Sequence, residues 1–318
     1  MIDDIYTRLL LSAANSHLAS AASKKELKFS DALPHRDIYS STLRVIYQND
    51  PESPFGLDYG RHLLPNLCDF SRLMLTCSTP LHALYLWQSL HHVQGTCYFP
   101  FVYEERDQVV VVLTYPYKNT VQNSQRRFTA ETAFYYVLNF ISQARGSALL
   151  ANKILLDFPE PEYAWRYKQE LSTQLEYNQP VSAIFLPRSE LLKPCQLFNP
   201  LLHETILTRF RQAARQNIER QSMQYRVVSQ MLHFHPQHFA MPALAANMHI
   251  SVRGLQKRLS KSEHSFSDLT KNARQALIQY YSLRGLTQEE MAEKLGFKSL
   301  AGLRRYLRAN TEQPLLPS

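Results

Sequence analysis

The sequence predicts an α+β N-terminal domain followed by an all-α domain in which two helix-turn-helix units are joined by a connector helix. Three observations lead to this fold class. Runs of β-branched and aromatic residues, which are typical of strands, occur only before about residue 200. Only helical patterns follow Leu201. Within that helical part, one helix-turn-helix pattern occurs twice.

The N-terminal domain is predicted to begin with helices. Residues 1 to about 30 have a polar-rich helical pattern. Residues 31–65 predict a helix, a proline-rich turn and a second short helix. The segment STPLHALYLWQSLHHV, residues 78–93, has the spacing of an amphipathic helix.

Strand patterns then alternate with helical ones. The segment TCYFPFVYEERDQVVVVLTYPY, residues 96–117, holds two strand-like runs around polar turn residues and predicts a hairpin. A helix is expected from about Ala130 to Ser147, followed by a strand at 152–158. The segment 163–171 predicts a helix and 182–187 a strand. This mixture makes the first 200 residues an α+β domain.

The charge of the chain is concentrated at its C-terminal end. The chain has 318 residues, of which 45% are hydrophobic and 19% charged, so it can bury the cores of two or three domains. Residues 240–318 hold 12 Lys and Arg against six Asp and Glu, a net charge of +6 out of the total of +8. A surface that attracts polyanions is therefore expected in the last quarter of the chain.

The cysteines and the N-terminus point to the cytoplasm. Cys68, Cys77, Cys97 and Cys195 show no CxxC spacing, so they suggest neither a zinc knuckle nor a disulfide framework. The first residues begin with acidic side chains, unlike a secretory signal. No apolar run approaches the ~20 residues of a membrane span, so no membrane partner is expected.

An internal repeat follows a long helical pattern. Residues 201–235 predict one long helix that leads to a boundary at Pro236. Beyond it, LAANMHISVRGLQKRL (244–259) and MAEKLGFKSLAGLRRYL (291–307) share a helix, a short turn and a second helix with leucines four residues apart. The second copy has one extra residue in its turn. We interpret the pair as a duplicated helix-turn-helix.

The second helix of each copy has one apolar and one polar face. On a helical wheel, the inward residues are Leu303, Leu307 and Tyr306 in the later copy, and Val252, Leu255 and Leu259 in the earlier copy. The outward residues are Arg304, Arg305 and Arg308 in the later copy, and Arg253, Gln256 and Lys257 in the earlier copy. Arg side chains can form hydrogen bonds with guanine, Gln side chains with adenine, and Lys side chains with guanine or phosphate. The outward faces are therefore candidates for reading DNA.

Local signals support this arrangement. Gly296 is expected to make the tight turn of the second copy, and Ser299 to cap the helix that follows. Capping boxes are predicted at Thr287 with Glu290 and at Ser265 with Asp268. An apolar stripe of Phe266, Leu269, Ala273, Leu277 and Tyr280 predicts a connector helix. At about 18 residues this rod would be about 27 Å long, enough to hold two recognition helices about one DNA turn apart.

Other candidate sites have a simpler explanation. The segment HFHPQH, residues 233–238, has three histidines without acidic or thiol partners nearby, and it is expected to be an exposed linker. His91 and His92 are expected to be structural or solvated. Glu160 and Glu162 flank a proline in a loop, so they are more typical of a solvated turn than of an acid–base pair. With none of the common catalytic or phosphate-binding motifs present, we expect no enzyme activity, no metal and no cofactor.

Residues 240–313 resemble the DNA-binding domain of the AraC/XylS family of bacterial transcription regulators. Two segments carry the likeness: ISVRGLQKRLSKSEHSFSDLTKNARQALIQYY and LTQEEMAEKLGFKSLAGLRRYLRANTEQPL. After Asn310, residues 311–314 differ from the Gly and Ser-Pro that the family commonly has there. The difference falls where the family forms its last short helix. In the second unit, Leu300 and Ala301 stand where polar readers often occur, so the first unit is expected to read bases more strongly.

The upstream region is similar to the N-terminal domain of the ornithine-utilisation-regulator branch of that family. PFGLDYGRHLLP, QRRFTAETAFYYVLNFI, ILLDFPEPEYAWRYKQEL and SAIFLPRSELLKP occur in the order found there. The resemblance implies an effector-sensing domain at residues 1–225 and a DNA-binding domain at 230–318. The effector would be a small molecule of unknown identity. Its binding would change dimer geometry or DNA engagement and so recruit RNA polymerase, which implies an activator and a homodimer.

The expected partner is double-stranded DNA. The expected contacts are Ser251, Arg253, Gln256, Lys257, Lys298, Ser299, Arg304, Arg305 and Arg308. An alternative remains open from the residues alone. A basic helix face is most often only a solvated surface, and the chain could be a catalytic or metal-binding protein whose C-terminal repeat docks a partner.

Overall fold

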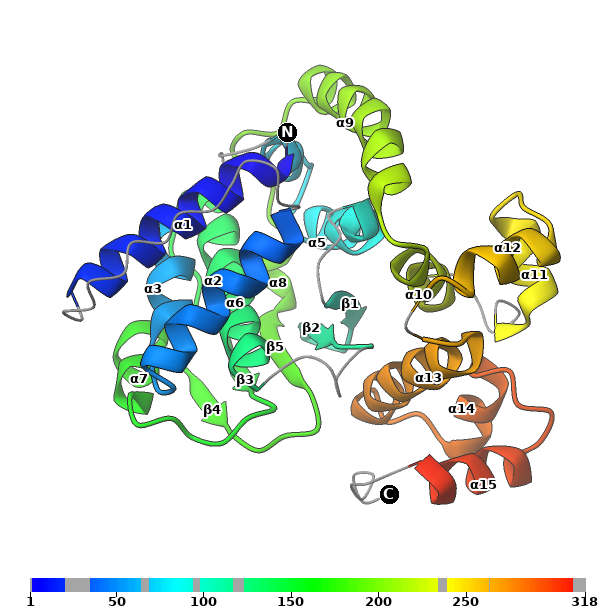
Figure 1. Cartoon of the computed structure of the whole chain (residues 1–318). Helices are drawn as coiled ribbons and strands as arrows, with labels where there is room; N and C mark the ends of the chain where they lie inside the picture. The colour runs from blue at the N-terminus through cyan, green and yellow to red at the C-terminus, as the bar shows by residue number, and fades with distance from the viewer. Residues whose placement is uncertain are drawn as a thin grey trace. The chain divides into compact units, whose positions relative to one another are not determined.

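The structure is a computed structural model, and it divides into two compact units (Figure 1). The first unit holds Met1–Leu113 and Asn119–Asn217, and the second holds Thr114–Lys118 and Ile218–Ser318. The structure describes residues 2–20, 35–63, 69–93, 98–116, 123–233, 239–262 and 264–310.

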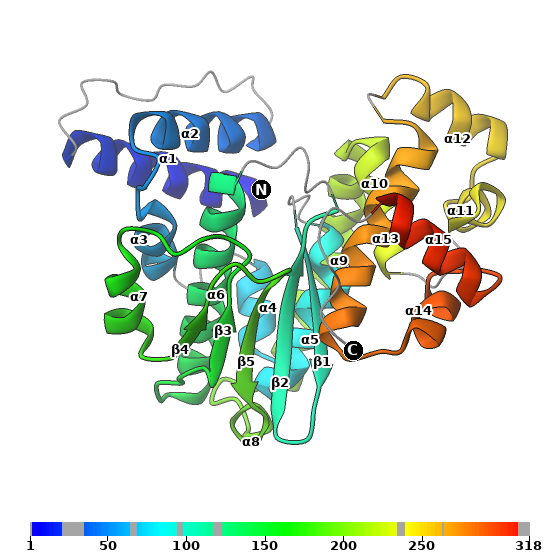
Figure 2. The same ribbon diagram turned by 90° about the horizontal axis from the view of Figure 1, so that it is seen from below.

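The first unit contains a helical core made from four helices. They are α1 (Ile2–Ser20), α2 (His35–Asn49), α3 (Phe55–His62) and α6 (Asn123–Arg145). Figure 2 shows α1 and α2 side by side. The apolar faces of the four helices meet in a cluster of Leu10, Ala14, Leu43, Ile46, Tyr47, Phe55, Tyr59, Leu63 and Phe128. At Gly60, an added Cβ would lie only 2.8 Å from Cβ of Tyr135, so this glycine lets α3 approach α6 closely.

A mixed five-stranded sheet completes the first unit, in the order β1-β2-β5-β3-β4 (Figure 2). The strands are β1 (Phe99–Glu104), β2 (Gln108–Thr114), β3 (Lys153–Leu155), β4 (Gln174–Glu176) and β5 (Ser182–Pro187). β5 pairs antiparallel with β2 and β3, whereas β3 and β4 are parallel. β2 and β5 are buried along almost their whole length because they occupy the inner positions of the sheet.

The remaining helices of the first unit are short, except the last. They are α4 (Asp69–Leu75), α5 (Pro80–Leu90), the 3-10 turn η1 (His91–Val93), α7 (Ala164–Leu171), α8 (Arg188–Leu191) and α9 (Pro200–Arg220). α5 packs against α4 and β1. The boundary between the two units falls within α9, between Asn217 and Ile218.

The second unit is all helical over the described part of residues 218–310. Its helices after α9 are α10 (Met223–His233), α11 (Met241–Asn247), α12 (Val252–Leu259), α13 (Phe266–Leu283), α14 (Gln288–Lys294) and α15 (Leu300–Asn310). α11 with α12, and α14 with α15, form the two helix-turn-helix units, and α13 connects them. α10 packs on α13, α11 and α12, and its Val227 and Val228 are fully buried.

The predicted fold class is therefore confirmed, with three local corrections. α6 begins at Asn123 rather than near Ala130. The predicted single helix over residues 201–235 is wrong, because the chain breaks between α9 and α10. There the Ser222 hydroxyl accepts a hydrogen bond from the Tyr225 amide at 3.2 Å and starts a new helix. The short β4, α4 and α8 were not predicted. Pro236 and residues 311–318, where a further short helix was in question, lie outside the described residues.

Candidate nucleic-acid interface

The two helix-turn-helix units have the same turn. His249 and Gly296, at equivalent places after the first helix of each unit, have φ values of +54° and +70°. The residue after each of them then donates a backbone hydrogen bond to the preceding helix: Ile250 to Ala245 at 3.0 Å, and Phe297 to Ala292 at 2.9 Å. Both turns therefore end the helix in a left-handed residue, as predicted at Gly296.

The recognition helices also begin alike. The Ser251 hydroxyl accepts a hydrogen bond from the Gly254 amide at 3.0 Å. The Ser299 hydroxyl accepts one from the Gly302 amide at 3.2 Å, which confirms the predicted cap. Lys298 is the extra residue of the second turn. The repeat seen in the sequence is thus a structural repeat, in which position 251 corresponds to 299.

The connector helix α13 contacts the second helix-turn-helix through polar groups. Its capping box at Ser265 and Asp268 is present, as is that of α14 at Thr287 and Glu290. The Tyr306 hydroxyl donates to the Lys271 carbonyl at 3.1 Å. The Gln275 amide donates to the Asn310 carbonyl at 3.0 Å. The middle and the C-terminal end of α15 are therefore tied to α13, which fixes the direction of this recognition helix.

The outward faces of α12 and α15 are exposed. Every residue expected to contact DNA is solvent-exposed: Ser251, Arg253, Gln256, Lys257, Lys298, Ser299, Arg304, Arg305 and Arg308. The inward leucines Leu255 and Leu303 are fully buried. One inward assignment is wrong: Val252, the first residue of α12, is 36% exposed. Leu307 and Tyr306 are half-buried.

Among the candidate DNA contacts of α15, Arg304 has a side-chain partner within the protein. Its Nε donates to Oε1 of Gln288 at the start of α14, at 2.9 Å. This contact holds the guanidinium near the N-terminal end of α14. Exposed cations of this kind are suited to phosphate oxygens.

The histidines considered in the sequence have structural partners or lie outside the described part. The Trp87 indole donates to Nδ1 of buried His91 at 2.9 Å, and Nε2 of His91 lies 3.0 Å from the Tyr98 carbonyl. His233 lies 3.0 Å from the Ser229 carbonyl within α10. Residues 234–238 are outside the described residues.

The structure also brings together three residues that the sequence interpretation did not connect. Cys77, His82 and His203 offer ligand atoms that all lie within 4.8 Å of one another. None of the helices in the described ranges is both long and apolar enough to cross a membrane.

Comparison with known proteins places the chain in a family. Residues 21–195, more than half of the chain, match the family described as the arabinose-binding domain of AraC transcription regulator, N-terminal. The fold is similar to that of a solved structure, the transcriptional regulator CdpR from Pseudomonas aeruginosa. The identity is 17%, 96% of each chain is covered, and the TM-score is 0.50. No curated protein matches the chain significantly. The chain belongs to the AraC family of transcription regulators.

Proposed function

We propose that this transcription regulator binds double-stranded DNA through α12 and α15. The observation that carries the proposal is the duplicated helix-turn-helix, in which two capped recognition helices bury a leucine and expose polar and basic side chains. A solvated basic face explains one such helix, but not two with matching turns and caps. The net charge of +6 over residues 240–318 favours a polyanionic partner.

The two recognition helices have different roles in this proposal. Arg253 and Gln256 on α12 are exposed and can pair with guanine and adenine edges in the major groove. On α15, the position equivalent to Arg253 is Ala301, which can offer only an apolar contact to a thymine methyl. Arg305 and Arg308 then serve as phosphate contacts that position the protein.

The N-terminal α+β unit is proposed to bind a small-molecule effector. The match of residues 21–195 to an effector-domain family supports this role. We further propose that effector binding controls a homodimer and that the DNA-bound protein activates transcription by recruiting RNA polymerase. The proposed effector-sensing part is residues 1–225, and the proposed DNA-binding part is 230–318, which needs the whole of α10, from Met223, to be stable.

Binding of the full chain to its own upstream DNA tests the proposal. We expect a preference for that fragment over random duplex of the same length and base composition. Equal binding to both duplexes, with retention on heparin that is lost at moderate salt, would instead indicate a basic surface without sequence recognition. That outcome would favour the alternative in which the repeat docks another partner.

A further inference from the structure

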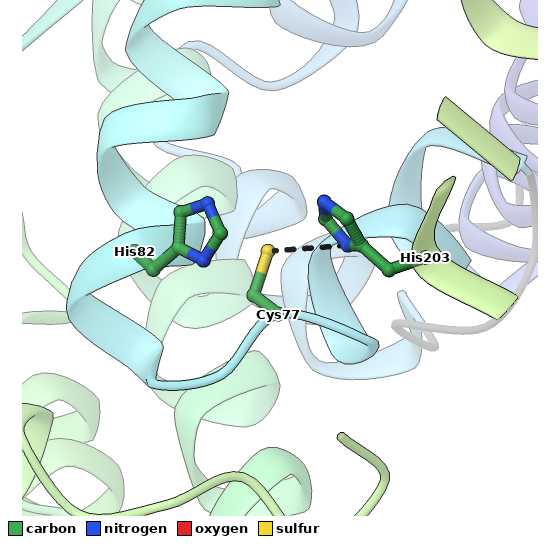
Figure 3. A group of neighbouring side chains, drawn as sticks. All are labelled: Cys77, His82 and His203. Carbon is green, nitrogen blue, oxygen red and sulfur yellow. Dashed lines mark hydrogen bonds between the residues drawn. The ribbon is translucent and has the colours of Figure 1, made fainter. Parts of the chain in front are cut away.

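Three side chains with metal-binding atoms meet in the first unit (Figure 3). Cys77 lies in the turn after α4, His82 in the first turn of α5, and His203 in the first turn of α9. Figure 3 shows the Cys77 sulfur between the two imidazole rings. We propose that Cys77, His82 and His203 form a binding site for a transition-metal ion of the zinc class.

Two helix starts fix the backbone of the histidines. In α5, the Thr79 hydroxyl accepts a hydrogen bond from the His82 amide at 3.1 Å, and Pro80 is the first helical residue. In α9, the Asn199 side chain accepts one from the Leu202 amide at 2.9 Å, beside His203. A capped helix start is a rigid element, so the positions of the two histidines do not depend on loop ordering.

The spacing suits a small tetrahedral ion. The ligand atoms that the three residues offer lie within 4.8 Å of one another, and the ring centroids of His82 and His203 are 5.6 Å apart. Zinc–sulfur and zinc–nitrogen bonds of about 2.3 and 2.1 Å place two tetrahedral ligand atoms about 3.3–3.6 Å apart. Small side-chain rotations are therefore enough to close the site around an ion.

The donor set selects the class of ion. One thiolate and two imidazoles suit zinc and other borderline or soft transition metals, whereas calcium and magnesium require oxygen ligands. Cys77 and His203 are buried, but His82 is exposed. A fourth position can therefore face solvent and take a water molecule or an exogenous ligand.

The surrounding hydroxyl groups orient both rings. The Thr76 hydroxyl donates to the Leu73 carbonyl at 2.9 Å, and the same oxygen lies 3.2 Å from Nδ1 of His203. Because that oxygen then acts as an acceptor, Nδ1 carries the proton and Nε2 keeps its lone pair for a metal. On the other side, the Ser78 hydroxyl lies 3.3 Å from Nδ1 of His82. Such outer-shell partners are typical of metal-binding histidines.

The site is separate from the proposed DNA contacts. His203 stands at the start of α9, the helix that contains the boundary between the two units. A bound ion would fix the first turn of α9 to the turn between α4 and α5. Metal binding can be measured without DNA, so its outcome does not depend on DNA recognition.

Cobalt titration of the reduced, tag-free full chain tests the proposal. We expect one Co²⁺ per chain, a thiolate-to-cobalt absorption band, and displacement of Co²⁺ by Zn²⁺. Cys77→Ser should remove the band. His82→Ala changes only an exposed side chain and leaves the helix cap intact, and it should weaken binding more than about tenfold.

Matched variants separate this site from other donors. Cys195→Ser removes a buried thiol outside the group of three, and His235→Ala removes an imidazole from the HFHPQH segment. Both should leave the band and the affinity unchanged. The proposal is overturned if Co²⁺ gives no thiolate band. It is also overturned if the band survives in Cys77→Ser, or if His82→Ala binds as well as the parent chain.

Discussion

The guanidinium carbon of Arg274 lies 4.6 Å from the ring centroid of Phe297. Arg274 belongs to the connector helix α13, and Phe297 to the turn of the second helix-turn-helix. The same guanidinium lies 4.9 Å from the ring of Phe239, which precedes α11, and 5.9 Å from that of Tyr306 on α15. One side chain of the connector helix therefore contacts aromatic rings beside the first helix-turn-helix and within the second. These contacts help fix the spacing of the two motifs.

Replacing the guanidinium of Arg274 should destabilise the C-terminal compact unit. Arg274→Lys keeps the charge but loses the planar surface that stacks on the rings, so we expect a loss of about 1–2 kcal/mol in the free energy of unfolding. Urea denaturation of residues 221–318, followed by circular dichroism, measures the change. Arg305→Lys, on an exposed face, is the control and should change stability little. An equal effect of both substitutions would argue against stacking at Arg274.

A fragment that includes α10 should fold and bind DNA alone. Residues 221–318 retain the buried Val227 and Val228, which lie in a helix packed on α13, α11 and α12. A fragment starting at residue 230 cuts that helix and should be unstable. Comparing the solubility and DNA affinity of the two fragments tests this. If the shorter fragment is as stable as the longer one, α10 is not part of the DNA-binding core.

Phosphate contacts on α15 should affect all sequences alike. Arg305→Ala and Arg308→Ala each remove an exposed cation, and each should reduce the salt dependence of binding by roughly one unit of slope. Affinities for specific and random duplex, measured over a range of salt concentrations, provide the test. A loss confined to one base position would show that the residue reads a base instead.

Glu131 should make the stability of the first unit depend on pH. It is buried in α6 and accepts hydrogen bonds from the hydroxyls of Tyr163, at 2.5 Å, and Tyr167. Burial raises its pKa from 4.5 to about 7, against the opposing effect of these hydrogen bonds. The fold therefore favours the protonated form. Its stabilising contribution is complete below about pH 4.5 and is lost as the pH rises through about 7.

Glu131→Gln keeps an accepting oxygen but carries no charge. Relative to this variant, the parent chain should lose up to about 3 kcal/mol between pH 4.5 and pH 8. Tryptophan fluorescence reports this unit, because Trp87 and Trp165 both lie in it. Parallel stability curves for the two proteins across this range would contradict the raised pKa.

The sequence predicted the elements whose signals are local. Strands such as β5 and caps such as those of Ser265 and Thr287 depend on a few adjacent residues, and they were found where expected. The repeat was found because its leucines and turns recur at a fixed spacing. β4 was missed because it has only three residues and depends on its pairing with β3. The break before Ser222 was missed because the helical pattern continues across it.

The candidate sites divide in the same way. The exposed face of α12 follows from helical periodicity, although Val252 shows that a wheel overestimates burial in a first turn. The grouping of Cys77, His82 and His203 could not be read from spacing, because tertiary packing brings α9 to the turn after α4. One local sign existed: both histidines follow a cap residue and a proline, in TPLH and NPLLH.

Selection from random duplex, with the parent chain and Arg253→Ala, tests the central claim most directly. Arg253 is exposed on α12 and can make a bidentate pair with guanine, whereas Ala301 occupies the equivalent place on α15. The parent chain should select a better-defined half-site under the first helix-turn-helix, which contains α12. The half-site under the second helix-turn-helix, one DNA turn or ~34 Å away, should be less well defined. Arg253→Ala should reduce the free-energy preference for the correct base at one base pair by about 1–3 kcal/mol. Equal information in both half-sites, or an unchanged preference in the variant, would contradict this account.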